Sequence, residues 1–148
     1  MIRTFKTTDA KAVEAVVHDA LLHTNTQDYP QRIIDRIRER LTADFFIQKS
    51  HEDTVVVAHK QEVILGTARL DKNLITNMFV APSAQNQGVG KALTKYLEEE
   101  AKRRGYQFVR VYGTLSAIEF YEHLGYQQVD VAIHEVFGTN AIMQKALA

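Results

Sequence analysis

The feature that most constrains the fold is a glycine-containing loop between an apolar segment and an amphipathic helix. The loop reads Gln85-Asn86-Gln87-Gly88-Val89-Gly90-Lys91 and follows residues 74–80, which are rich in β-branched residues and predict a strand. Two glycines at the start of a helix let the backbone approach a ligand closely. The first N–H groups of a helix lack internal partners, and the helix dipole favours an anion there. The sequence therefore predicts a phosphate or pyrophosphate site at Gly88–Lys91.

Two common phosphate-binding motifs do not fit this loop. A P-loop would require a glycine at Gln85 and a serine or threonine at Ala92. A dinucleotide-binding fingerprint that starts at Gly88 would require a glycine at Leu93. Taken alone, the loop could also be a glycine-rich turn that binds no ligand.

The rest of the chain predicts alternating strands and helices. We expect a strand at residues 2–5, helices at 9–21 and 30–41, and an antiparallel meander of three strands at 54–58, 63–70 and 74–80. A helix at 89–104, a strand at 108–112, a helix at 116–124 and strands at 126–133 and 141–145 follow. In the long helix, Glu98–Lys102 and Glu99–Arg103 are predicted to pair on the solvent face.

The length of 148 residues predicts a single domain over residues 1–148, and the order of elements predicts the α/β (α+β) class. The two strands that flank the 89–104 helix need a crossover connection, so they are most simply parallel. The other strands are joined by short turns. The result is a mixed, mostly antiparallel central sheet with helices on both faces.

The composition disfavours or excludes several classes of function. Lys+Arg and Asp+Glu both number 18, so no basic excess favours nucleic-acid binding. The chain has no cysteine, which excludes disulfides, thiolate metal sites and a cysteine nucleophile. The six histidines form no metal-binding pattern, and we expect no metal. No signal peptide or apolar run of membrane-spanning length occurs, so a soluble, cytoplasmic protein is expected.

Two motifs together resemble the GNAT superfamily of acyl-CoA-dependent N-acetyltransferases. The first is the family signature [QR]-x-x-G-x-[GA], here Gln85 to Gly90, between a strand and an amphipathic helix. The second is A-x-x-[FY]-Y-x-x-x-G-[FY], here Ala117 to Tyr126. The order of predicted elements also matches. The resemblance implies a splayed pair of parallel strands with acyl-CoA between them.

The resemblance also implies roles for individual residues. The loop would bind the pyrophosphate of coenzyme A, mostly through backbone N–H groups, and the preceding strand would line the pantetheine arm. A backbone N–H of that strand would polarise the thioester carbonyl. Tyr121 would be the acid that protonates the leaving thiolate, although it could instead be a core aromatic beside Phe120. The implied cofactor-binding residues are Met78, Phe79, Val80, Gln85, Asn86, Gln87, Gly88, Val89, Gly90, Lys91, Ala117 and Phe120.

The acceptor side is less defined. Family members usually bind the acceptor between the first two helices, which points to Asn25 and Tyr29, although this segment could be an ordinary loop. Many members carry a carboxylate on the strand before the signature, whereas residues 74–80 contain no acid. Thr114 stands where the family often has an asparagine that contacts coenzyme A. A general base could come from elsewhere, with His134, Glu135, Asp71 and His51 as candidates.

The leading expectation is an N-acetyltransferase that moves an acetyl group from acetyl-CoA to a primary amine of a small molecule or peptide. The amine would attack directly in a ternary complex, since there is no cysteine to carry an acyl group. The alternative is a non-catalytic acyl-CoA-binding regulatory module, motivated by the missing carboxylate. A transferase acting on charged tRNA is disfavoured by the zero net charge. A homodimer is possible.

Overall fold

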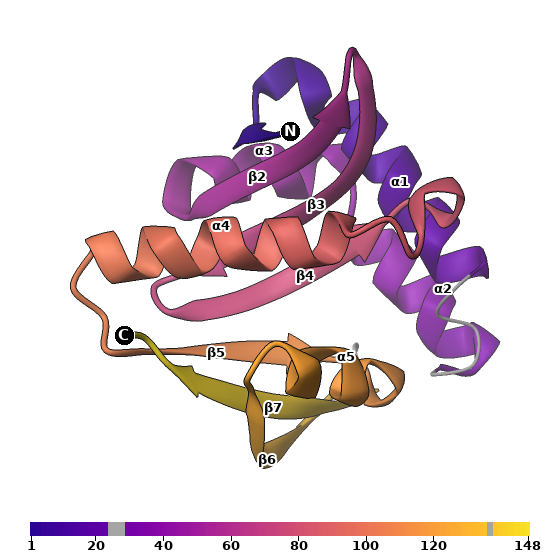
Figure 1. Cartoon of the computed structure of the whole chain (residues 1–148). Helices are drawn as coiled ribbons and strands as arrows, with labels where there is room; N and C mark the ends of the chain where they lie inside the picture. The colour runs from indigo at the N-terminus through magenta and orange to yellow at the C-terminus, as the bar shows by residue number, and fades with distance from the viewer. Residues whose placement is uncertain (24–28, 136–137) are drawn as a thin grey trace.

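The computed structural model describes residues 1–23, 29–135 and 138–148. In these residues seven strands form one sheet in the order β1-β2-β3-β4-β5-β7-β6 (Figure 1). The strands are β1 (Ile2–Thr4), β2 (Thr54–Lys60), β3 (Val63–Asp71), β4 (Leu74–Val80), β5 (Phe108–Gly113), β6 (Gln127–His134) and β7 (Gly138–Ala146). The helices are α1 (Ala10–His23), α2 (Gln31–Arg40), α3 (Ala43–Glu52), α4 (Val89–Arg103) and α5 (Ile118–His123). Short 3-10 turns are η1 (Thr7–Asp9), η2 (Pro82–Ala84) and η3 (Leu115–Ala117).

The sheet is covered by helices on both faces, as the sequence predicts. Strand β2 illustrates why, since all of residues 55–58 are buried and successive side chains point to opposite faces. Val56 and Ala58 belong to the core that α4 and α5 cover. Val55 and Val57 belong to the core that α1, α2 and α3 cover. A strand buried on both faces reads as a continuous apolar run, as residues 54–58 do.

The parallel pairing of β4 and β5 is confirmed, and it is short. Only Leu74 and Ile75 of β4 pair with β5, opposite Arg110 and Val111. Beyond Ile75 the two strands diverge toward the end where the 81–88 loop and α5 lie (Figure 1). Strand β4 stays paired with β3, and β5 stays paired with β7 as far as Gly113. The predicted splay is therefore present.

One helix is missing from the sequence prediction. Residues 43–52 form α3, which covers the sheet next to α1 and buries Phe46 completely. The Thr42 side chain caps this helix by accepting a hydrogen bond from the Phe45 N–H at 3.3 Å. The segment joins α2 to β2 after a very short connection, so no loop signal separates it from the preceding helix.

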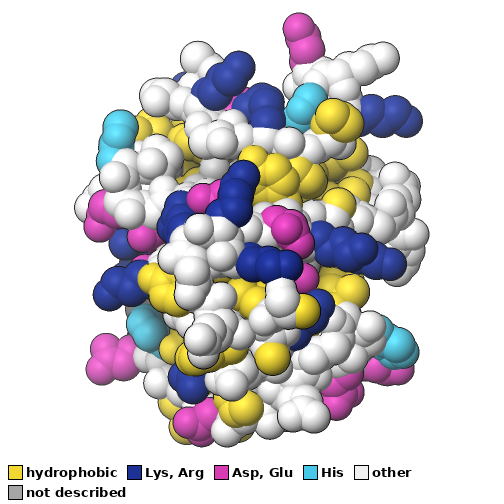
Figure 2. Space-filling model, turned by 60° about the vertical axis from the view of Figure 1, so that its left-hand side comes forward, with side chains coloured by type: hydrophobic (Ala, Val, Ile, Leu, Met, Phe, Trp, Pro, Cys, Tyr) yellow, Lys and Arg dark blue, Asp and Glu magenta, His cyan; other side chains and the backbone are white. Residues whose placement is uncertain are grey.

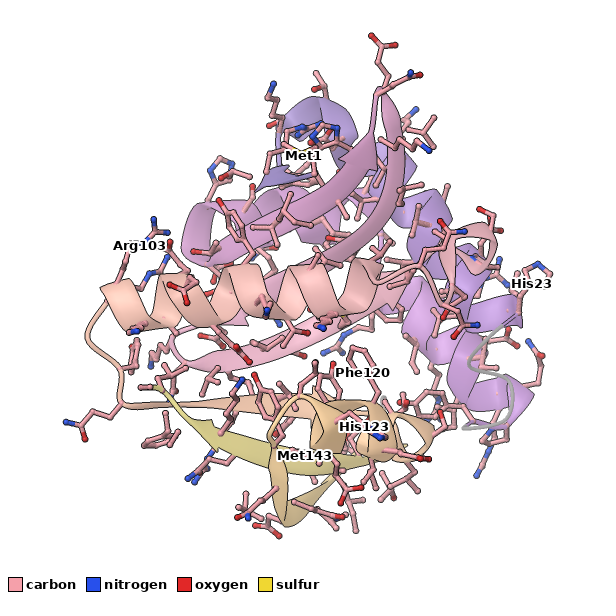
Figure 3. The ribbon with its side chains drawn as sticks, viewed as in Figure 1. Met1, His23, Arg103, Phe120, His123 and Met143 are labelled. Carbon is pink, nitrogen blue, oxygen red and sulfur yellow. The ribbon has the colours of Figure 1, made fainter. Side chains whose placement is uncertain are left out.

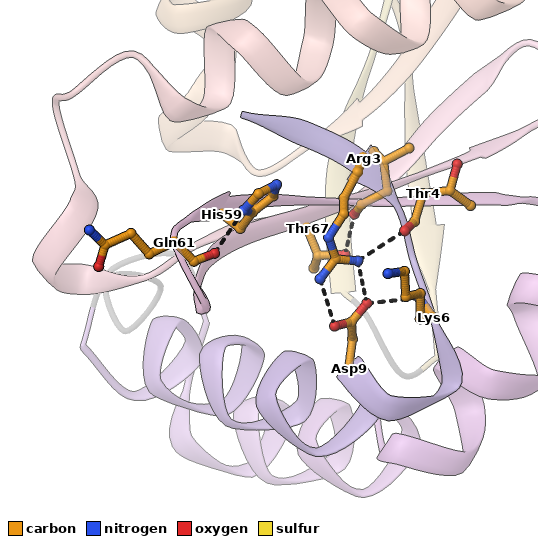
Figure 4. A network of polar contacts seen from close by, with 8 residues as sticks. Arg3, Thr4, Lys6, Asp9, His59, Gln61 and Thr67 are labelled. Atoms are coloured by element: carbon orange, nitrogen blue, oxygen red, sulfur yellow. Dashed lines mark hydrogen bonds and ion pairs between the residues drawn. The ribbon is translucent and has the colours of Figure 1, made fainter.

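The chain entry into the first helix is fixed by a charged network (Figure 4). The Arg3 guanidinium donates two hydrogen bonds to the Asp9 carboxylate, at 2.8 and 2.9 Å. Asp9 also accepts from the Lys6 backbone N–H at 2.8 Å, which caps the start of η1. These bonds to the charged form, above all that from Arg3, lower the pKa of Asp9 below its usual range.

We predict that this network stabilises the fold above the ordinary carboxylate pKa and loses its effect in acid. Because folding lowers the pKa of Asp9, the contribution is present above about pH 4 and disappears as the pH falls through the lowered folded-state value. Asp9→Asn should lower the free energy of unfolding by about 1–2 kcal/mol at pH 7. Urea unfolding at pH 7 and pH 2.5 measures this, and an equal loss at both pH values contradicts it.

Candidate functional site

The residues that the sequence assigns to a site gather at the diverging end of β4 and β5. Both strands run toward this end, since they are parallel. Met78, Phe79 and Val80 occupy the last three positions of β4, and the glycine-containing loop follows them after η2. Gly113 ends β5 at the same end, and Tyr121 packs against it. The predicted cofactor residues are thus brought together by the divergence of the strands.

The loop before α4 is shaped by its own amide side chains. Gln85 donates through Nε2 to the Val80 carbonyl at 3.0 Å, and Gln87 donates to the Ser83 carbonyl at 3.2 Å. Asn86 and Gly88 both have left-handed backbones, with φ of 61° and 81°. Gly88 is the residue that precedes α4, so its lack of a side chain permits the turn into the helix. The two glutamine amides thus donate to carbonyls before the loop, and the turn leads to the first backbone N–H groups of α4, which lack partners within the helix.

The N-terminus of α4 has the properties of an anion site. The helix spans 15 residues, so its dipole places a partial positive charge at Val89 and Gly90. Lys91 is exposed in the first turn and adds a full charge. The first turn contains no acidic residue that would repel an anion. The arrangement suits a phosphate or pyrophosphate group.

Strand β4 contains a β-bulge at the point where it leaves β5. Thr67 pairs with Phe79 and Arg69 pairs with Thr76, so two residues of β4, Asn77 and Met78, oppose one residue of β3. A bulge leaves one residue outside the regular ladder and bends the strand. The bulge lies just past Ile75, the last β4 residue paired with β5. Peptide groups of β4 are therefore displaced from regular pairing beside the divergence.

Tyr121 is buried at the diverging end of β5. Its side chain is 2% exposed, and its ring carbons would lie 3.0–3.2 Å from a Cβ at Gly113. A side chain at this position would therefore be in tight contact with the ring, which glycine avoids. Burial raises the pKa of the Tyr121 hydroxyl above its usual value, so the group stays protonated at physiological pH. A protonated hydroxyl is what an acid at this place requires.

Phe120 and Ala117 lie on the same side of the sheet as α4. The Phe120 ring points from α5 toward the start of α4, where a Cβ added at Gly90 would meet it at 3.2 Å (Figure 3). Phe120 is 38% exposed, so the ring borders solvent as well as the glycine loop. Ala117 is half-buried and packs against the core below Tyr121.

Of the two residues predicted on the acceptor side, only Tyr29 can be placed, because Asn25 lies outside the described residues. The Tyr29 hydroxyl donates to Asn140 Oδ1 at 2.9 Å. Asn140 is buried on β7 next to Ala141, which pairs with Gly113. Ala141 faces the α4 side of the sheet, so Asn140 faces the other side. Tyr29 therefore lies near the diverging end, on the face opposite α4.

The candidate bases are spread over the molecule. His134 and Glu135 are exposed at the end of β6, where Arg36 of α2 donates to the Glu135 carbonyl at 3.3 Å. Asp71 of β3 pairs with Leu74, at the end where β4 is still paired with β5. His51 lies in the last turn of α3. Thr114 precedes η3 directly after β5, with its hydroxyl 3.4 Å from that of Ser116. Strand β4 itself contains no aspartate or glutamate.

A buried charged cluster that the sequence analysis missed lies beside Tyr121. Tyr126 donates its hydroxyl to Glu98 Oε2 at 2.6 Å, and Lys145 Nζ lies 3.2 and 3.3 Å from the two Glu98 oxygens. Burial and the Glu98 carboxylate raise the pKa of Tyr126, which keeps its proton on the donor. The Tyr126 ring packs edge-on against Tyr121, with centroids 5.6 Å apart.

The predicted Glu98–Lys102 surface pair is therefore wrong. Glu98 is 8% exposed and faces the core. It follows Thr94 by four residues and precedes Ala101 by three, and both of these are fully buried. This helical spacing could have shown from the sequence that Glu98 faces the core. On the exposed face Glu100, rather than Glu99, pairs with Arg103 and with Arg104.

We predict that Tyr126→Phe lowers the free energy of unfolding by about 1–3 kcal/mol, since it removes a donor from a buried carboxylate. Urea unfolding measures the loss. Tyr112→Phe is the matched control, because Tyr112 is 39% exposed and should change stability little. Equal effects of the two substitutions would contradict a role for the buried hydrogen bond.

Figure 2 shows Lys and Arg side chains interspersed with Asp and Glu across the face it presents. Among the described residues, no group of three or more His, Asp or Glu side chains is placed to hold a metal ion. No helix in that part of the chain is long and apolar enough to cross a membrane.

Comparison with known proteins identifies the relatives of this chain. A family model described as an acetyltransferase (GNAT) domain matches residues 17–146. An uncharacterized N-acetyltransferase from Methanocaldococcus jannaschii is 30% identical over 100 residues, which cover 58% of this chain and 44% of that protein. The match thus spans less than half the length of this relative.

Solved structures share the fold over nearly the whole chain. A GCN5-related N-acetyltransferase from Rhodopseudomonas palustris superposes with a TM-score of 0.93 at 22% identity, covering 99% of this chain and 95% of that one. A PaiA N-acetyltransferase from Thermoplasma acidophilum, solved in complex with coenzyme A, superposes with a TM-score of 0.83 at 19% identity. That likeness covers 99% of this chain and 98% of the other.

Proposed function

The chain belongs to the GNAT acetyltransferase family, and on that basis we propose that it transfers an acetyl group from acetyl-CoA to a primary amine of a small molecule or peptide. The observation that carries the proposal is the divergence of β4 and β5 toward the N-terminus of α4. The divergence brings the N-terminus of α4, the unpaired edges of the two strands and the buried Tyr121 to one end of the sheet.

Acetyl-CoA, the proposed acetyl donor, fits the residues at this end of the sheet. The pyrophosphate of coenzyme A would bind the backbone N–H groups at the start of α4, with Lys91 contributing charge. The pantetheine arm carries amide groups, and the edge of β4 beyond Ile75 has no pairing to β5. Met78 packs toward the α4 side and Phe79 toward the α1 side, so the arm would lie between apolar side chains.

The proposed reaction is a direct attack within a ternary complex. The amine nitrogen forms a bond to the thioester carbon, and the carbonyl oxygen gains negative charge. A backbone N–H at the β4 bulge would stabilise that charge. When the intermediate collapses, the carbon–sulfur bond breaks and the sulfur leaves with the electron pair. The nitrogen, which carries two hydrogens after the attack, gives one proton to water, and the thiolate takes up a proton.

Tyr121 is proposed as the source of the proton for the thiolate. Its hydroxyl is protonated because burial raises its pKa. A free thiol has a pKa near 8.5 and a free phenol a pKa near 10, so the transfer in water is uphill by about 2 kcal/mol. Burial in the unliganded protein raises the tyrosine value further. Burial disfavours the charged form of either group, so it also raises the pKa of a thiol held beside the hydroxyl and offsets this effect.

The acceptor amine must reach the site without its extra proton. For a lysine-like amine with a pKa near 10.4, the neutral form at pH 7 costs about 4.6 kcal/mol. Strand β4 contributes no carboxylate to remove that proton. We therefore propose that the proton leaves through water, or that the acceptor has a low pKa. Tyr29 and Asn140, on the face opposite α4, are proposed to border the acceptor.

Acetyl-CoA should stabilise the fold. At 100 times its dissociation constant, a ligand adds about 2.7 kcal/mol to the free energy of unfolding. For a domain of this size the melting temperature should rise by about 5–10 °C. Thermal unfolding with acetyl-CoA, with adenosine as the control ligand, measures this. No shift at millimolar acetyl-CoA would contradict the proposed donor.

Tyr121→Phe distinguishes the transferase from a non-catalytic acyl-CoA-binding module. The substitution removes the hydroxyl and preserves the ring that packs on Gly113 and Tyr126. We predict that turnover with a panel of amines falls by about 10²-fold or more while the dissociation constant for acetyl-CoA is unchanged. Radiolabelled acetyl transfer and calorimetry measure the two quantities. Equal turnover of the two proteins contradicts the assigned acid, and absence of transfer by the wild type despite binding favours the module.

A further inference from the structure

Asn77 has a backbone conformation that the hairpin does not require. Its φ is 52°, although it lies within a strand and is not a glycine. A left-handed residue costs free energy, and asparagine tolerates it better than most residues do. Lys72 has a similar φ of 57°, but it stands in the two-residue turn between β3 and β4, where such turns need left-handed residues. Asn77 instead occupies the β4 bulge beside the divergence.

A side-chain clamp holds Asn77 in this conformation. Arg69 Nε donates to Asn77 Oδ1 at 2.8 Å. The same guanidinium forms an ion pair with Asp53 through Nη1, and both side chains are only 12% exposed. The guanidinium also lies over the Phe45 ring, 5.7 Å from its centroid. A buried, planar guanidinium with fixed partners on two sides has little freedom to move.

The clamp is anchored outside the sheet. Asp53 is the residue that ends α3, and its N–H donates to the Lys49 carbonyl at 2.7 Å. The chain of contacts therefore runs from α3 through Arg69 on β3 to Asn77 on β4. A buried ion pair contributes little net stability compared with apolar packing, so its consequence is a fixed geometry at its end point. That end point is the bulge.

We propose that Arg69, held by Asp53, is a positioning residue that fixes the β4 bulge through Asn77, so that a bulge N–H is aimed at the thioester oxygen of bound acetyl-CoA. This inference rests on the proposed function. Stabilisation of a developing oxyanion depends on donors that are already oriented before the reaction. A bulge that could relax to regular pairing would turn its peptide groups back into the ladder with β3.

The test uses the thioester itself as the probe, because it needs no acceptor. A hydrogen bond to a carbonyl oxygen lowers the C=O stretching frequency. Infrared difference spectra of bound acetyl-CoA with a ¹³C-labelled thioester carbonyl report this frequency directly. We expect the wild-type protein to lower it relative to free acetyl-CoA. Asn77→Gly, which permits a left-handed backbone but removes the acceptor for Arg69, should lose most of the shift with an unchanged dissociation constant.

Two variants serve as matched comparisons. Asn77→Asp keeps an acceptor for Arg69 and should retain the wild-type shift. Lys72→Gly alters the other left-handed residue of the same hairpin, away from the bulge, and should also retain it. Asp53→Asn weakens the anchor of Arg69 without touching β4, and should lose part of the shift even where Asn77→Gly does not fold.

Each outcome decides the inference. It is overturned if Asn77→Gly and Asp53→Asn keep the wild-type frequency, or if Lys72→Gly loses it equally. It is also overturned, with the proposed donor intact, if acetyl-CoA binds the wild type without a change in frequency. If the wild type does not bind acetyl-CoA, both the inference and the proposed function fail.

Discussion

The short pairing between β4 and β5 is the constraint on which the rest of the site depends. Two residues of β4 pair with β5, and the strands then separate while each keeps its other neighbour. The sheet is therefore continuous at one end and split at the other. Backbone groups along the split have no partner across it, and unpaired polar groups are costly unless water or a ligand satisfies them. A ligand with amide groups and an anionic end matches this arrangement.

Polar clusters that are at least partly buried lie on both faces of the sheet. On the α4 face, Glu98 joins Tyr126 and Lys145, and so connects α4 to the part of the sheet that contains β7. On the α3 face, Arg69 joins Asp53 to Asn77. Since buried ion pairs are weak sources of stability, their common effect is to fix the position of neighbouring groups. One cluster supports Tyr121 through the Tyr126 ring, and the other holds the β4 bulge.

Patterns in the sequence predict most of the fold, because they depend on local periodicity. The glycine loop and the parallel pair follow from residues 74–112, whereas the position of β7 between β5 and β6 in the sheet was not predicted. Helix α3 was missed because its Thr42 cap follows α2 almost directly. Glu98 was placed on the surface because its partners Tyr126 and Lys145 are 28 and 47 residues away. The Asn77 bulge likewise depends on register and on Arg69 and Asp53, which no local pattern in the strand reveals.

The central claim is that the split between β4 and β5 receives coenzyme A with its phosphates at the start of α4. A crystal structure of the chain grown with coenzyme A tests it most directly. We expect pyrophosphate oxygens within hydrogen-bond distance of the backbone N–H groups of Gly88–Lys91, and a pantetheine arm between β4 and β5 with its sulfur near Tyr121. Coenzyme A bound elsewhere on the protein, with the split closed by protein side chains, would contradict it.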